Sequence, residues 1–366
     1  MVKTSIAIAA ALVLLSGCAP RTANQEVSND VQELRLKDYA PTSIFNIPVT
    51  EVPQAKYPVI DMHSHDYAST PGEVAAWVAT LDACNIDLVN VMHCEWIGAP
   101  FDEMVERYGA YPDRFAIWCS LDYTDFDKED WSERAIARLE ELHSKGAVGI
   151  GEMVDKGLGD TYARPVSGLG IHIDDPKLQP VLKRAGELGM PVNIHLAEPI
   201  WMYEELNNHN DGLMNGANWK VDTTIEGCYD YNEIMAAFER AVAANPNTTF
   251  IACHYMNMTN DYPRLGALLD KYNNLYVDIG ARIGESAVIP RASRRFIMKY
   301  ADRVLYGTDN GMSPDMYRFT FRILETDDEH IYQPDFGYHW SYSGFYLPND
   351  VLHKIYRDNA LKIIKR

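Results

Sequence analysis

The strongest constraint on the fold is a regular alternation of strand-like and helix-like segments. From residue 57 onward, eight short runs rich in β-branched residues alternate with eight stretches that have amphipathic helical spacing. Repetition of a strand followed by a helix is typical of a parallel (β/α)8 barrel. A doubly wound open sheet is the competing α/β architecture, but no glycine-rich dinucleotide fingerprint follows the first strand. The sequence therefore predicts an α/β fold, a TIM barrel.

The predicted elements can be given by their residues. The strands are Val59–Met62, Asp87–Met92, Phe115–Leu121, Val148–Met153, Pro191–His195, Thr249–His254, Leu275–Ile279 and Arg303–Tyr306. The helices include Pro71–Cys84, Trp131–Lys145, Pro176–Leu188, Tyr231–Ala244, Pro263–Tyr272 and Arg291–Tyr300. Two long connections, Val154–Asp175 and Ala197–Tyr229, leave the carboxyl ends of their strands, where barrel enzymes build their sites.

Two histidines, His63 and His65, follow the first predicted strand. Successive side chains of an extended strand point to opposite faces, so both imidazoles face one side and can hold one metal ion, while Ser64 faces away. A hydrolytic metal site normally needs three or four protein ligands and one position open to water. Further ligands must therefore come from other strands.

Other strands also end in ionisable residues. Glu152 ends the fourth strand, His195 the fifth and His254 the sixth, and Asp309 comes just past the eighth. Any one of them has a simpler explanation, because a histidine at a strand end is more often a satisfied polar residue than a ligand. Together they place donors at the catalytic rim of one barrel, which a purely structural barrel does not need. The candidate metal ligands are His63, His65, Glu152, His195, His254 and Asp309.

This ordered set resembles the amidohydrolase superfamily, in the amidohydrolase-related (amidohydrolase 2) branch of metal-dependent hydrolases. The matching motifs are His63-Ser64-His65, Gly-Ile-Gly-Glu ending at Glu152, Asn-Ile-His ending at His195, Ala-Cys-His ending at His254 and Tyr-Gly-Thr-Asp ending at Asp309. The segment from Leu347 to Ala360 is similar to the closing helix of that branch.

The resemblance implies that His63, His65 and Asp309 hold a first divalent metal ion, and that His195 joins them or holds a second. In some branches a strand-four carboxylate bridges two ions, whereas many members of this branch keep one ion and leave His254 free. The Gly-Ile-Gly-Glu context favours Glu152 as a bridge. Imidazole and carboxylate donors suit Zn2+, and other divalent ions remain open.

The resemblance also suggests a mechanism. A bound metal would activate a water and polarise the scissile oxygen of the substrate. Asp309 is the candidate general base, and His254, if it is not a ligand, would stabilise the oxyanion or shuttle the proton. Arg282, just past the seventh strand, is placed to meet a substrate carboxylate or phosphate, with a surface ion pair as the alternative. Asn193 shares the face of His195 and is predicted to line the substrate site or to support the ligands.

The N-terminus indicates export. The first residues resemble a bacterial lipoprotein signal: Lys3 precedes an apolar run from Ile6 to Leu15, and this run continues into Leu15-Ser16-Gly17-Cys18. We expect a signal peptide at residues 1–17, lipidation at Cys18, a tether at 18–52 and the barrel at 53–366. Residue 19 is Ala and not Asp, which favours an outer-membrane destination in the cell envelope of a Gram-negative bacterium. The alternative is an ordinary cleaved signal with an incidental cysteine.

The net charge of the chain limits the classes of partner that it is expected to bind. A formal charge of −19 argues against nucleic acid as a partner, and the membrane is expected to be contacted only through the lipid anchor.

The leading hypothesis for the function is a metal-dependent hydrolase that cleaves a C–N or C–O bond of a small amide, ester or lactone. One alternative is a decarboxylase of the same branch, against which the export signal argues. The other is a non-catalytic ligand-binding lipoprotein, against which the complete donor set argues.

Overall fold

The computed structural model describes residues 30–93, 100–159, 170–333 and 336–364, in two units, Met1–Tyr39 and Ala40–Arg366. In the first unit, the described residues contain a short 3-10 helix, η1 Leu36–Asp38. Arg35, which precedes this helix, pairs with Asp38: its Nε lies 2.6 Å from Asp38 Oδ2. The predicted signal peptide and Cys18 lie outside the described residues, so lipidation and the domain bounds stay predictions. Within the described ranges, no helix is long and apolar enough to cross a bilayer.

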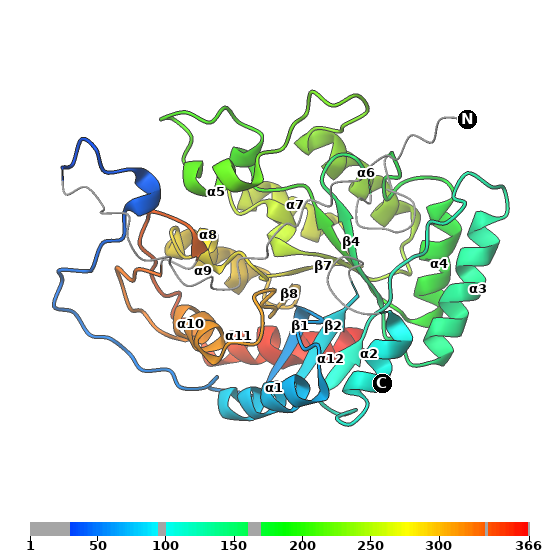
Figure 1. Ribbon diagram of the computed structural model, residues 1–366, viewed down its shortest axis with the longest axis horizontal. Coiled ribbons are helices and arrows are strands. Elements are labelled where there is room, and N and C mark those ends of the chain that lie inside the picture. Colours follow the sequence, from blue (N-terminus) through cyan, green and yellow to red (C-terminus); the bar gives the residue numbers. More distant parts are fainter. Residues whose placement is uncertain (1–29, 94–99, 160–169, 334–335, 365–366) are drawn as a thin grey trace, which may run out of the picture. The chain divides into compact units, whose positions relative to one another are not determined.

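The second unit is a closed parallel barrel (Figure 1). Its strands form two hydrogen-bonded groups, β1-β2-β3 and β4-β5-β6-β7-β8. Backbone hydrogen bonds join the two groups at both edges: Val148 N donates to Ile117 O at 3.0 Å, and Met62 N donates to Tyr306 O at 2.9 Å. The strands are β1 Val59–His65, β2 Ile86–Met92, β3 Phe115–Ile117, β4 Ile150–Asp155, β5 Val192–Leu196, β6 Phe250–Ala252, β7 Leu275–Asp278 and β8 Val304–Leu305. The predicted α/β TIM barrel is confirmed.

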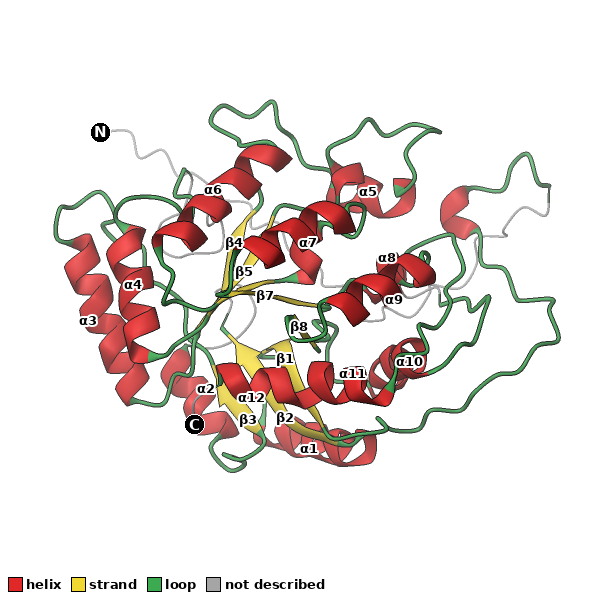
Figure 2. Cartoon of the chain, turned by 180° about the vertical axis from the view of Figure 1, so that it is seen from behind, coloured by secondary structure: helices red, strands yellow, loops and turns green. Residues whose placement is uncertain are grey.

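Helices surround the strands on their outer side (Figure 2). They are α1 Pro71–Cys84, α2 Phe101–Tyr108, α3 Trp131–Ser144, α4 Leu178–Leu188, α5 Leu213–Trp219, α6 Tyr231–Ala244, α7 Tyr262–Lys271, α8 Ile283–Ser286, α9 Pro290–Lys299, α10 Pro314–Glu325, α11 Asn349–His353 and α12 Asn359–Ile363. Short 3-10 helices, η2 Ile200–Met202 and η3 His254–Asn257, follow β5 and β6, and a π-helical turn, η5 Lys354–Asp358, joins α11 to α12.

One of the two long connections contains helices that the sequence analysis does not predict. The segment 197–229 contains η2 and α5. Gly216 and two asparagines make α5 a weak helix former, so its local sequence does not indicate a helix. Packing explains it instead: a Cβ on Gly212, the residue that precedes α5, would lie 2.3 Å from Trp201 Cγ, so only glycine lets the indole lie this close.

Two apolar clusters fill the inside and the outside of the barrel. The smaller joins Ile60, Leu88, Trp118, Ile251 and Leu305 from five strands and so occupies the interior, whereas the larger packs the strands against the helices. A Cβ on Gly149 would lie 2.5 Å from the Trp118 ring. The glycine that precedes Ile150 is therefore required for close packing, as the sequence predicts, and the backbone that leads to Glu152 lies against this core.

Segments before and after the barrel strands complete the unit. Thr50, within the predicted tether, donates from its backbone N to Asp328 Oδ2 at 2.8 Å. After the last strand, Tyr306 N donates to Ile355 O at 2.9 Å, and Asn359 Nδ2 donates to the carbonyls of Ala301 and Val304. The C-terminal helices thus brace β8, the strand that positions Asp309.

Candidate metal centre

The two histidines of β1 point at one carboxylate. The β1–β2 register shifts between Asp61 and Ser64, and both His63 and His65 are buried. His65 Nε2 lies 3.1 Å and His63 Nε2 3.7 Å from Asp309 Oδ1. Both imidazoles therefore reach the same residue beyond β8, as the alternation of an extended strand predicts.

Glu152 lies at the centre of four imidazoles. Its Oε1 is 3.6 Å from His63 Nε2, 3.3 Å from His195 Nδ1 and 3.4 Å from His254 Nε2. Its Oε2 is 3.3 Å from His65 Nε2. One oxygen of this carboxylate thus contacts three imidazoles, from β1 and from the ends of β5 and β6, and the other oxygen contacts His65. The structure brings all six predicted ligands together.

Several buried polar atoms of this cluster have no hydrogen-bond partner within the described residues. They include His63 Nε2 and Glu152 Oε1, which face the other candidate ligands, and His195 Nε2, which lies 3.5 Å from Glu198 Oε1 on the other side of its ring. A buried polar atom without a partner typically costs about 1–3 kcal/mol, so such atoms need another partner. Donor atoms within 4.8 Å of one another form two sets, His63, His65 and Asp309, and His63, Glu152, Cys253 and His254. This arrangement fits a divalent metal ion, and the Cys253 thiol is a neighbour that the sequence reasoning missed.

The pKa shifts of His63 and Asp309 also favour positive charge within this cluster. Burial alone would lower the pKa of His63, but the carboxylates of Asp278, Asp309 and Glu152 raise it to about 10. For Asp309, burial would raise the pKa, but His63 and His65 hold it well below its usual range. Ionised carboxylates therefore hold a proton on His63 when no other cation competes, which is the electrostatic environment of a cation site.

Asp278 at the end of β7 orients His63. Its Oδ2 lies 2.9 Å from His63 Nδ1, across 215 residues of sequence. Its Oδ1 accepts from the backbone N of His254 at 3.0 Å and of Gly280 at 2.9 Å. A proton on His63 Nδ1 leaves the Nε2 lone pair directed at Glu152 and Asp309. Sequence reasoning missed this role, although the aspartate at a strand end on the catalytic rim was a usable signal.

We expect Asp278→Asn to weaken metal binding by about 10- to 100-fold. The amide carries no negative charge, so it holds the proton on His63 Nδ1 less firmly than the carboxylate does. Titration of the metal-free protein with Zn2+ against a competing chelator measures the affinity. The exposed Asp270 on α7, changed to Asn, is the control. Unchanged affinity in Asp278→Asn would show that His63 is oriented by packing alone.

Arg282 and Asn193 are both buried. Arg282 is 8% exposed, and its Nε donates to Asn257 Oδ1 at 2.7 Å and lies 3.3 Å from Glu285 Oε2. A surface ion pair is therefore the wrong description of it. Asn193 is fully buried, and its Oδ1 accepts from the Cys253 thiol. Its position fits the supporting role and not substrate contact.

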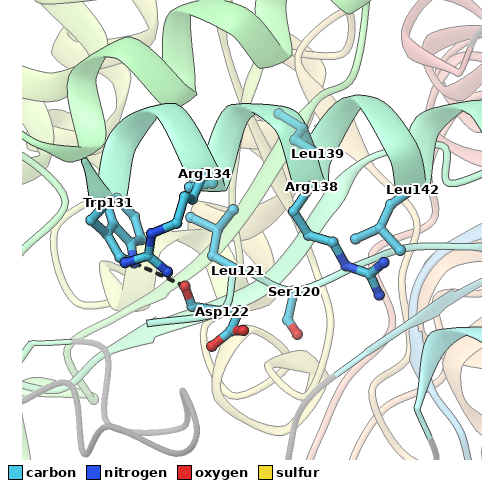
Figure 3. A pocket seen from close by; sticks show the side chains of 9 residues that line it. Ser120, Leu121, Asp122, Trp131, Arg134, Arg138, Leu139 and Leu142 are labelled. Carbon is cyan, nitrogen blue, oxygen red and sulfur yellow. Dashed lines mark hydrogen bonds between the residues drawn. The ribbon is translucent and has the colours of Figure 1, made fainter. Parts of the chain in front are cut away.

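Figure 3 shows a cavity of about 180 Å³ beside α3, away from this cluster. Among the described residues, its lining is Ser120, Leu121, Asp122, Trp131, Arg134, Ala135, Arg138, Leu139 and Leu142. Trp131 Nε1 donates to Asp122 O at 3.0 Å at one end. None of the predicted site residues lines this cavity, so it is distinct from the metal-binding cluster.

Comparisons with known proteins agree with this fold. The sequence model of the family described as Amidohydrolase matches residues 60–366. No curated protein matches the chain. Among solved structures, an uncharacterised TIM-barrel protein from Bordetella bronchiseptica is 16% identical, with a TM-score of 0.52, and the alignment covers 84% of this chain and 98% of that one.

Two further solved structures are decarboxylases. The 2,6-dihydroxybenzoate decarboxylase from Rhizobium is 15% identical, with a TM-score of 0.52 and coverage of 84% of this chain and 98% of that one. The 5-carboxyvanillate decarboxylase from Novosphingobium aromaticivorans, complexed with manganese and 4-hydroxy-3-methoxy-5-nitrobenzoic acid, is 14% identical, with a TM-score of 0.51 and coverage of 86% and 99%. At these identities the likeness shows the fold alone.

Proposed function

Because the chain belongs to the amidohydrolase family, whose model matches residues 60–366, we propose that it is a divalent-metal-dependent enzyme acting on a small organic molecule. The observation that carries this proposal is the contact of the buried Glu152 carboxylate with four imidazoles, from β1 and from the ends of β5 and β6. His63, His65 and Asp309 would hold one ion, and His195 and His254 would hold a second. Glu152 would be shared by both.

The reaction that this geometry supports best is hydrolysis of a C–N or C–O bond. Bound divalent ions supply Lewis-acid polarisation of the substrate oxygen and of the attacking water. Of the two candidate carboxylate ligands, Asp309 is the more exposed: its side chain is 20% exposed, and that of Glu152 is 6% exposed. It is therefore the carboxylate that can take a proton from the nucleophile and pass it to the leaving group.

The histidine tautomers are consistent with this role. His254 Nδ1 donates to Gly280 O at 2.7 Å, which leaves the Nε2 lone pair facing Glu152. Burial and the nearby Arg282 cation lower the pKa of His254, so this imidazole is neutral at pH 7 and able to ligate. The donor set suits Zn2+, and Mn2+ is the ion in one of the decarboxylase structures.

Decarboxylation of an aromatic acid is the second candidate. The solved structures support it better than they support hydrolysis, because the two decarboxylases share this fold and one holds a nitrobenzoic acid. Arg282 supports it too, since its Nη2 is 3.5 Å from Glu198 Oε2, a contact long enough for a substrate carboxylate to compete with. The predicted export signal still argues against this reaction.

A two-panel assay separates the candidates. The purified protein, reloaded with Zn2+ or Mn2+, is incubated with lactones, esters and amides in ¹⁸O-labelled water, and separately with hydroxybenzoates. Hydrolysis predicts label in the carboxylate product, whereas decarboxylation predicts CO2 release from the second panel alone. Activity that survives complete removal of metal would contradict both.

A further inference from the structure

Glu198 lies beside His195 because the chain turns back after β5. Ala197 has a φ of 56°, in the left-handed region, and Glu198 is therefore folded over the histidine three residues before it. Ala197 N donates to Asp155 O at 2.7 Å, and Asn257 Nδ2 donates to the carbonyls of Leu196 and Ala197. The end of β4 and the 3-10 helix η3 thus hold this turn in place.

The Glu198 carboxylate is buried and touches three positively charged or ionisable groups. Its Oε1 is 2.5 Å from Lys156 Nζ and 3.5 Å from His195 Nε2, and its Oε2 is 3.5 Å from Arg282 Nη2. One buried carboxylate is thus shared by a lysine, an arginine and a histidine of the centre.

We propose that Glu198 is a positioning residue that orients His195 toward the second metal ion. His195 Nδ1 lies 3.3 Å from Glu152 Oε1 and 3.1 Å from His254 Nε2, so Nδ1 faces the centre and Nε2 faces Glu198. A proton on Nε2, held by a carboxylate, leaves the Nδ1 lone pair for a metal and makes the imidazole more basic. This inference rests on the proposed two-ion centre.

Charge balance is the competing role for Glu198. Arg282 lies between two carboxylates, Glu198 and Glu285, and both are nearly fully buried. Glu285 accepts from the Tyr338 hydroxyl at 2.6 Å, and among the described residues it forms no hydrogen bond or ion pair with a histidine of the centre. If Glu198 only balanced Arg282 and Lys156, loss of either carboxylate would have a similar effect on metal binding. If it orients His195, only loss of Glu198 would weaken the second ion.

The test compares Glu198→Gln with Glu285→Gln by Zn2+ titration of the metal-free full chain, with elemental analysis of the loaded protein. Glutamine keeps the volume of Glu198 and removes its charge. We expect the first ion to bind as in the unmodified protein and the second to bind about 10- to 100-fold more weakly in Glu198→Gln alone. Equal affinity for the second ion, or equal weakening in Glu285→Gln, would overturn the proposal.

A second variant guards against misfolding of Glu198→Gln. Lys156→Gln removes the cation that competes with His195 for Glu198 Oε1, so the second ion should bind at least as tightly as in the unmodified chain. Weaker binding in Lys156→Gln would count against the positioning role. An unmodified protein that binds only one ion would instead refute the two-ion centre itself, which separates failure of the proposed function from failure of this inference.

Discussion

Asp309→Asn is expected to lower turnover by roughly 10²- to 10⁴-fold, because the amide cannot accept the proton that a general base must take. Asp309 is held in place by His65 Nε2 at 3.1 Å and by the hydroxyl of Tyr67 at 3.5 Å from its Oδ1. Its pKa is held below the usual range by the histidines despite burial, so the native residue is ionised at neutral pH. Steady-state kinetics on the substrate found by the two-panel assay measure the loss.

The control for this variant is Asp315→Asn on α10, whose side chain is 86% exposed and lies outside the centre. It should keep full activity. Metal content has to be measured alongside, since Asp309 is also a candidate ligand. Turnover equal to that of the native protein would refute the catalytic role and favour the non-catalytic binding hypothesis.

Glu152→Gln is expected to lower the metal content from about two ions per chain to about one, because a neutral amide is a poor bridging ligand. The four imidazoles around Glu152 lie 3.3–3.6 Å from its oxygens. Burial alone would raise the pKa of Glu152, but His63 and the other histidines hold this pKa well below its usual range. Loss of the negative charge therefore removes the group that both half-sites share. Elemental analysis after dialysis gives the count.

Glu285→Gln is the matched control, since it removes a buried carboxylate whose partners are Arg282 and Tyr338 and not the four histidines. It should retain about two ions. One ion in both the native protein and Glu152→Gln would free His254 for proton transfer and would favour the decarboxylase. No bound metal after reloading would contradict metal dependence altogether.

The ligand set could be predicted because it is encoded locally. Each candidate follows an apolar β-branched run, as His254 follows Phe250–Cys253 and Asp309 follows Val304–Tyr306, and parallel strands bring their carboxyl ends to one rim. The eight strands and the helices Pro71–Cys84 and Tyr231–Ala244 were found for the same reason, since their periodicity is a property of a short window. Lipidation at Cys18 and export remain predictions.

The orienting groups could be predicted only in part. Asp278 ends its strand on the catalytic rim, which is a usable signal, but neither its local pattern nor that of Glu198 assigns a partner. Their contacts depend on which imidazole nitrogen each one faces, and on the left-handed turn at Ala197. Arg282 is buried and not at the surface, and the carboxylates of Glu198 and Glu285 contact it.

By itself, the sequence determined the barrel, the order of its strands and the chemical identity of the metal-binding cluster, because hydrophobic periodicity and strand-end position are local. Only the tertiary structure decided that Glu152 contacts four imidazoles, that Asp278 and Glu198 each face one imidazole nitrogen, and that Asn193 is buried against Cys253 and Asp278. These contacts join residues far apart in sequence. They exist because ring closure brings β8 next to β1 and because the turn after β5 is held by its neighbours, and no local pattern specifies either distance.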